Sequence, residues 1–149
     1  MRLNFTHDDY RRLINELGGA GYEFLFFPEA EDRLGKRSQF ALLRHDVDID
    51  LEPASALAEV DARLNVNSTY FFMLRTSHYN VFSQEGSTQV RRILAPGHAL
   101  GLHFDCAAYP EESTVAELAA ACRREATMLG DWFGQAEVDP INWTGFRHS

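Results

Sequence analysis

The chain has 149 residues, of which 45% are hydrophobic and 12% aromatic, so we expect one folded domain spanning residues 1–149 rather than a disordered chain. The formal net charge is -8 and the sequence contains no stripe of Lys and Arg, which disfavours a nucleic-acid partner. No apolar run approaches the roughly 18 residues of a membrane span, and the two cysteines are isolated, so we predict a cytoplasmic protein with reduced thiols and no membrane segment.

The first half of the chain predicts two strands and two helices. Thr6 precedes a helical segment that ends at Gly18-Gly19. Residues 22–27 are rich in aromatic side chains and indicate a strand, and a second strand is predicted at residues 40–44. The charged residues between these strands predict a loop. Residues 51–64 carry apolar side chains at the spacing of one helix face, and an acid directly before them can cap that helix.

The second half continues the alternation of strands and helices. Residues 68–74 and 99–104 are apolar runs typical of strands, with a short helix between them. A last helix is predicted over residues 114–129 with Gly130 as its stop, and residues 141–146 are a candidate final strand. This alternation predicts an α/β fold with a parallel sheet.

Polar side chains follow two of the predicted strands. Asp46 and Asp48 come directly after the strand at residues 40–44, and His103 and Asp105 end the later strand. Because functional residues gather where parallel strands end, we expect these side chains to lie close together. Acids crowded in this way repel one another unless a cation lies among them, so the first hypothesis is a metal-centred site.

Asp46 and Asp48 suit two different tasks at such a site. They are two residues apart, so on a regular strand both side chains point to the same face. A cation bound by one carboxylate lowers the pKa of its water, and the other carboxylate can then accept the proton as a general base. The alternative is that these acids only cap the following helix, and we expect either Asp48 or Asp50 to do so.

His103 supplies a neutral imidazole of the kind that zinc binds beside a carboxylate, although a histidine in an apolar run is more often a hydrogen-bonded core residue. Asp105 can ligate or orient. We interpret His98 as structural. The loop after residue 74 carries Tyr79 and Asn80, and it is either a binding loop or an ordinary polar surface.

The run Arg44-His45-Asp46-Val47-Asp48, followed by residues 69–74 and then 97–105, resembles successive motifs of the polysaccharide deacetylase superfamily (NodB homology, carbohydrate esterase family 4). The resemblance covers about residues 20–130 and is closest to the RHDVD-type branch associated with surface-polysaccharide synthesis. It implies a distorted (β/α) barrel. It also implies a hydrolase in which a divalent metal, usually zinc, activates water to remove acetyl from an N-acetylated sugar or polysaccharide precursor.

By position, the resemblance makes Asp46 the catalytic base and makes Asp48 and His103 metal ligands. Substrate-binding side chains would come from the loops, and the implied candidates are Arg44, Tyr79 and Asn80.

Two features depart from the family pattern. The family commonly has a second ligand histidine four residues after His103, where this chain has Ala107, so a third ligand would come from Asp105, His45 or His148. A closed barrel usually needs about 200 residues or more, so we expect an open or half barrel in a domain truncated at its C-terminus. The segment that supplies the catalytic acid would then be absent, and a homo-oligomer could cover the open sheet edge.

Two other functions stay open. A catalytically silent truncated deacetylase-like or sugar-binding module would keep the fold without the chemistry, and Ala107 and the short chain favour it. A hydrolase of small-molecule amides is a further alternative, because related folds host that reaction.

Overall fold

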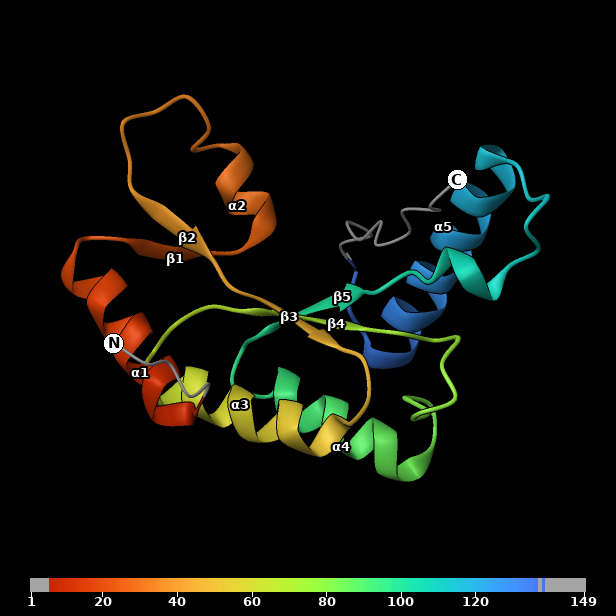
Figure 1. Ribbon diagram of the computed structural model, residues 1–149, viewed down its shortest axis with the longest axis horizontal. Coiled ribbons are helices and arrows are strands. Elements are labelled where there is room, and N and C mark those ends of the chain that lie inside the picture. Colours follow the sequence, from red (N-terminus) through yellow and green to blue (C-terminus); the bar gives the residue numbers. More distant parts are fainter. Residues whose placement is uncertain (1–5, 137, 139–149) are drawn as a thin grey trace.

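Helices and strands alternate along the computed structural model, which describes residues 6–136 and 138 (Figure 1). The elements in chain order are α1 (His7–Gly19), β1 (Glu23–Leu25), α2 (Phe27–Glu31), β2 (Phe40–Leu42), β3 (Arg44–Val47), α3 (Leu51–Arg63), β4 (Thr69–Phe72), α4 (Gln84–Leu94), β5 (Ala99–Leu102), the 3-10 turn η1 (Cys106–Ala108) and α5 (Val115–Phe133). The expected α/β class is confirmed.

The strands form two separate parallel sheets. β1 pairs with β2, and β3, β4 and β5 form a three-stranded sheet in that order. The predicted parallel pairing is therefore confirmed. The described residues form no closed barrel, and β3 is an edge strand of the larger sheet. This open arrangement is consistent with part of the barrel that the resemblance implied.

The three-stranded sheet has two different faces, because side chains alternate along a strand. We call the rear face the one that carries His45 and Val47 of β3, Tyr70 and Phe72 of β4, and Leu100 and Leu102 of β5. The front face carries Arg44 and Asp46 of β3, Phe71 of β4 and Gly101 of β5. The sequence-adjacent residues His45 and Asp46 thus belong to opposite faces.

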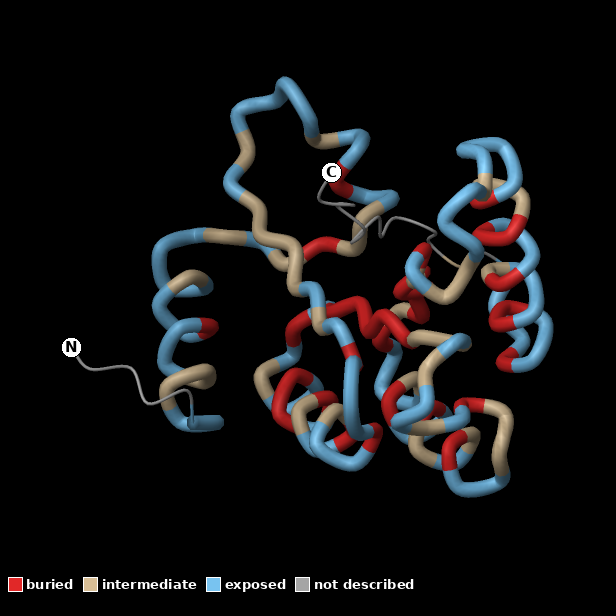
Figure 2. The backbone as a smooth tube through the Cα atoms, turned by 45° about the vertical axis from the view of Figure 1, so that its right-hand side comes forward, coloured by how far each residue is buried: buried red, intermediate tan, exposed pale blue. Residues whose placement is uncertain are grey.

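A continuous buried core joins the rear face to the helices. It contains Val47, Phe72 and Leu102 of the sheet, Ala58 of α3, Val90 and Ile93 of α4, and Leu118 and Leu129 of α5. The central strands and the inner sides of these helices are buried in Figure 2, whereas the helix surfaces turned outward are exposed. Because burial of apolar surface is the main driving force of folding, this core fixes where the strand ends lie.

The N-terminal elements agree with those predicted from the sequence, with one correction. Thr6 and Asp9 form a capping box at the start of α1, as the start signals predicted. The strand predicted over residues 22–27 ends earlier, because the chain turns into α2 at Phe27. Pro28 suits the first turn of a helix, and the Glu29 carboxylate accepts the backbone N–H of Phe26 at 2.8 Å.

The strand predicted at residues 40–44 is two strands in the structure. β2 pairs with β1, β3 pairs with β4, and Leu43 lies between them. The Leu43 carbonyl accepts the backbone N–H of Thr69 at 2.9 Å, so the chain changes sheets without leaving that group unpaired. As a result Asp46 lies inside β3 rather than after it.

The cap of α3 is Asp50, whose carboxylate accepts the backbone N–H of Glu52 at 3.0 Å. This confirms that one of the acids after Val47 caps the helix, and it leaves the side chain of Asp48 available for other contacts.

The last helix is longer than predicted. α5 continues through Gly130 to Phe133, and Gly134, whose φ of 68° is left-handed, caps it. A Cβ at Gly130 would lie 2.8 Å from the Gln135 carbonyl oxygen, so this glycine gives room to the returning chain rather than stopping the helix. The candidate strand at residues 141–146 lies outside the described residues. Within the described ranges no helix is both long enough and apolar enough to cross a bilayer.

Candidate functional site

The ends of β3 and β5 bring an acid and an imidazole together. Asp48 Oδ1 lies 3.1 Å from His103 Nδ1. His103 is buried, and its backbone N–H donates to the Phe72 carbonyl at 2.9 Å, which continues the sheet ladder beyond β5. The Asp48 side chain is 60% exposed. The two side chains therefore meet at the edge where the parallel strands end, while their roles as metal ligands stay predictions.

Asp46 is paired with a permanent cation on the front face. Arg44 Nε donates to Asp46 Oδ1 at 2.8 Å and Arg44 Nη2 donates to Asp46 Oδ2 at 2.7 Å, which is a bidentate ion pair. The guanidinium also lies over the Phe71 ring, 5.4 Å from its centroid. The hydrogen bond to Asp46 raises the pKa of Arg44 against the opposing effect of burial, and the charges of Asp46 and Asp48 raise it further.

Asp46 and Asp48 do not share the face of one continuous strand. β3 ends at Val47, so Asp48 lies in the connection to α3 and contacts His103, whereas Asp46 contacts Arg44. Both acids act electrostatically on the same guanidinium. The two carboxylates thus have different partners within one site, as different chemical tasks would require.

A groove of about 930 Å³ runs beside these acids, between α1 and the connection from β3 to α3. Its lining includes Asp46 and Asp48 together with Leu13, Ile49 and Leu57. Leu13 is 52% exposed and Ile49 is 67% exposed. Ligand pockets commonly have volumes of roughly 300–1,000 Å³ and combine apolar walls with a few polar groups. This groove has both properties.

The hydroxyl of Tyr79 is engaged by the backbone. It donates to the Val47 carbonyl and accepts the backbone N–H of Met73 at 2.9 Å. Burial raises the pKa of Tyr79 to about 12 against the effect of the Met73 bond, with a further contribution from the Asp48 charge. Tyr79 therefore joins the end of β3 to the chain that follows β4, directly behind the candidate site.

Two other candidate residues bind backbone groups next to them. Asn80 Oδ1 accepts the N–H of Phe82 at 2.9 Å, in the turn before α4. Asp105 Oδ1 accepts the N–H of Ala107 at 2.9 Å and caps η1. These bonds fix the loops on which the two residues lie. A contact of either residue with a substrate or a metal stays a prediction.

His45 points to the rear face, away from Asp46. Its Nε2 lies 3.0 Å from Asp61 Oδ2, and its ring packs on the Tyr70 ring with centroids 4.7 Å apart. The side chain of His45, which was considered as a metal ligand, thus points toward α3. His148, the other histidine considered as a third ligand, lies outside the described residues.

Asp61 is a completely buried carboxylate, with 0% of its surface exposed. Its hydrogen-bond donors are Tyr10 at 2.7 Å, Ser68 at 2.7 Å, Tyr70 at 2.8 Å and His45 at 3.0 Å. Burial alone raises the pKa of Asp61, but the hydrogen bonds from His45, Tyr10 and Ser68 outweigh it and hold the pKa below its usual value. Burial and the nearby Asp61 also raise the pKa values of Tyr10 and Tyr70, so both phenols stay donors.

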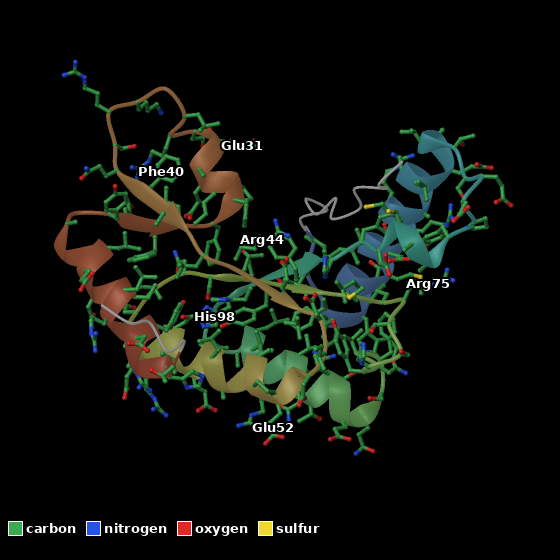
Figure 3. The ribbon with its side chains drawn as sticks, in the orientation of Figure 1. Glu31, Phe40, Arg44, Glu52, Arg75 and His98 are labelled. Atoms are coloured by element: carbon green, nitrogen blue, oxygen red, sulfur yellow. The ribbon has the colours of Figure 1, made fainter. Side chains whose placement is uncertain are left out.

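His98 extends this network to the start of β5. Its Nδ1 lies 3.0 Å from Ser68 Oγ, and its Nε2 lies 2.9 Å from the Ala58 carbonyl oxygen. Figure 3 labels His98 below the sheet, toward α3, and Arg44 above it. The interpretation of His98 as structural agrees with these contacts.

The buried network was missed in the sequence, although one signal for it exists. Asp61 follows Leu57 and Ala58 at helical spacing, so it occupies the apolar face of α3. An acid in that register must be either paired or neutral when the helix packs. Its partners come from four other parts of the chain, and no local pattern identifies them.

The described residues do not complete a metal site by themselves. Asp48 and His103 have the donor chemistry of a zinc site, but catalytic zinc usually has three protein ligands. Within residues 6–136 and 138 no group of three or more His, Cys, Asp or Glu side chains converges to hold a metal. The described residues therefore fit a zinc site only in part, because Asp48 and His103 supply two of the three protein ligands that such a site needs.

Comparison with known proteins supports the fold. No family profile matches the chain, and no curated protein matches its sequence. The structure is similar to that of IcaB from Ammonifex degensii, with a TM-score of 0.63 and 18% sequence identity over 90% of this chain. The chain spans 66% of the length of IcaB. At such low identity this similarity shows that the chain has the fold of IcaB, and the fold alone.

Proposed function

We propose that the protein is a polysaccharide deacetylase-like hydrolase that removes acetyl from an N-acetylated sugar or polysaccharide precursor. The observation that carries this proposal is the contact of 3.1 Å between Asp48 and His103 beside the ion pair of Arg44 and Asp46. Asp48 and His103 lie just after the ends of β3 and β5, and Arg44 and Asp46 lie within β3, in a fold similar to that of IcaB, a polysaccharide deacetylase.

In this proposal Asp46 is the general base. A general base must be held in a fixed orientation toward its substrate, and the bidentate pair with Arg44 holds the Asp46 carboxylate on the front face. Arg44 thus acts by holding the base, and it can also meet a substrate oxygen from the same face. The groove of about 930 Å³ beside Asp46 would hold the sugar, with its aliphatic wall against the nonpolar face of the ring.

Asp48 and His103 would be two ligands of a divalent metal, most simply zinc. When bound, such a metal lowers the pKa of its water and polarises an amide carbonyl. The 60% exposed carboxylate of Asp48 can turn to the metal, while burial fixes the ring of His103. A third ligand has to come from outside this pair.

Metal analysis and a deacetylation assay test the proposal together. We expect protein purified without chelator to carry zinc or a similar metal, and Asp48→Asn and His103→Gln to lose most of it. Asp46→Asn should keep the metal but lose acetate release from N-acetylated oligosaccharides. Asp32→Asn is the matched control, because it removes one exposed carboxylate elsewhere. Metal content equal in all variants, with no acetate released, would refute the proposal.

A catalytically silent sugar-binding module is the second candidate. One observation favours it: among the described residues, only two candidate metal ligands, Asp48 and His103, lie in contact. Calorimetric binding of N-acetylated oligosaccharides by a protein that neither holds metal nor releases acetate would support it.

We also propose that the protein works in the cytoplasm. Cys106 and Cys122 are both buried and free, which suits a reducing compartment. Fractionation of cells that make the full protein tests this placement.

A further inference from the structure

We propose that Asp61 is a positioning residue of the candidate site, which acts through His45 to hold the Arg44–Asp46 pair on the front face of β3. This inference rests on the proposed function only for its catalytic consequence. The structural coupling between Asp61 and the Arg44–Asp46 pair can be tested whether or not the protein is an enzyme.

Asp61 has the properties of a fixed anchor. It is completely buried, and its four donors come from α1, β3, β4 and the turn before β4. A buried carboxylate with several charge-assisted bonds has little freedom to move. Because α3 carries it and packs into the core, the anchor is rigid with respect to β4 and β5.

The bond from His45 fixes both the ring and its tautomer. Asp61 Oδ2 is an ionised acceptor, so His45 Nε2 carries the hydrogen that is donated over 3.0 Å. Tyr10 gives its own hydrogen to Asp61 Oδ1 at 2.7 Å, so its oxygen, 3.4 Å from His45 Nε2, can only accept. Packing of the ring on Tyr70 completes the restraint.

β3 is held by few backbone bonds. It has four residues and, like β5, pairs only with β4 within the described sheet, so its side chains contribute to setting its rotation about the strand axis. His45 lies between Arg44 and Asp46, and alternation makes its side chain point opposite to both. A rotation that releases His45 from Asp61 therefore also turns the front-face pair.

Nuclear magnetic resonance of the labelled full chain tests the coupling at the front face. The Arg44 Nε–H donates to Asp46, so its exchange with water reports on that pair. In Asp61→Asn and His45→Leu we expect this exchange to accelerate by on the order of tenfold or more. In His45→Gln, whose amide can still donate to Asp61, exchange should stay near that of the unchanged protein.

Ser68→Ala is the matched control. Ser68 donates to the same oxygen of Asp61 as His45 does, but it has no bond to His45 in the structure described. It should lower the melting temperature and leave the Arg44 signal unchanged. If His45→Leu remains folded with unchanged Arg44 exchange, or if Ser68→Ala changes that exchange as strongly, Asp61 is only a structural residue and the inference is overturned.

Kinetics add the catalytic consequence. If the protein releases acetate, His45→Leu should lower kcat by about 100-fold with little change in KM, because a displaced base affects the reaction more than substrate binding. His45→Gln should restore most of kcat. Absence of acetate release by the unchanged protein would refute the proposed function, whereas the exchange measurement would still decide the coupling.

Discussion

His45 and Asp46 are neighbours in β3, yet their side chains enter opposite environments. His45 joins a buried network in which Asp61 accepts hydrogen bonds from four donors and has no exposed surface. Asp46 faces the front, where its side chain is 28% exposed and pairs with Arg44. The groove beside α1 runs along the edge of β3 and is lined by both residues. The difference between them therefore lies in their partners, which are a buried network for His45 and an exposed ion pair for Asp46.

This difference separates stability from chemistry within a single motif. The rear-face residues are paired in a low-dielectric interior, where loss of one partner is costly. On the front face Asp46 pairs with Arg44, and at the strand ends Asp48 contacts His103, with both acids at least partly exposed. Substitutions on the two faces should therefore have very different effects.

Removal of the buried carboxylate is the largest expected effect. Asp61→Ala leaves four donors without an acceptor and should lower the free energy of unfolding by about 3–5 kcal/mol. Asp46→Asn, at an exposed ion pair, should lower it by less than about 1 kcal/mol. Urea unfolding at pH 7 measures both. Equal losses for the two variants would contradict the division between the faces.

Part of the front face is tightly packed around Gly101 and Phe71, and Gly101→Ala tests this packing. A Cβ at Gly101 would lie 2.4 Å from the ring of Phe71, which is fully buried and contacts the Phe27 ring at 5.7 Å between centroids. Overpacking of this kind should cost about 1–3 kcal/mol. Ala99→Gly, one step away on the same face, should give a smaller loss by thermal unfolding. An unchanged melting temperature in Gly101→Ala would mean that Phe71 can move aside.

Tyr79→Phe tests the link between the two regions. The variant removes the hydroxyl that joins the Val47 carbonyl to the Met73 N–H, so we expect a loss of about 1–2 kcal/mol. Tyr22→Phe is the control, since its hydroxyl has no hydrogen bond to a residue in the described part of the chain. A loss no larger than that of the control would argue against this link.

The smallest expected effect is a pH dependence of stability. The pKa of Asp61 lies below its usual value in the fold because hydrogen bonds from His45, Tyr10 and Ser68 outweigh the effect of burial. A lowered pKa means that the unfolded chain binds the proton first, so this contribution is present above about pH 4 and is lost as the pH falls further. Asp61→Asn should flatten the slope of unfolding free energy between about pH 4 and pH 2. A slope equal to that of the unchanged protein would show that other acids account for it.

Much of the fold could be predicted from local signals. Capping residues such as Thr6 and Asp50, and the apolar runs at β4 and β5, define elements within a few residues. The split between β2 and β3 could not be predicted, because it depends on which strand each segment pairs with. The continuation of α5 through Gly130 depends on a returning chain that no local pattern reveals.

Some features of the candidate site could likewise be predicted from the sequence, and others could not. The approach of Asp48 and His103 follows from parallel strand ends, so it could be expected. The bidentate pair of Arg44 and Asp46 and the anchoring of His45 by Asp61 depend on side-chain orientation, which sequence spacing does not determine. The hydrogen bonds of Tyr79 and Asn80 to backbone groups also could not be read from the sequence, and the substrate contacts of these two residues stay a prediction.

Ser68 connects two parts of the fold that are far apart in the sequence. Its hydroxyl donates to Asp61 Oδ2 at 2.7 Å, and the same oxygen lies 3.0 Å from His98 Nδ1. The other ring nitrogen of His98 lies 2.9 Å from the Ala58 carbonyl oxygen. Ala58 and Asp61 are one helical turn apart on α3, so the helix is held at two points to the chain that enters β5.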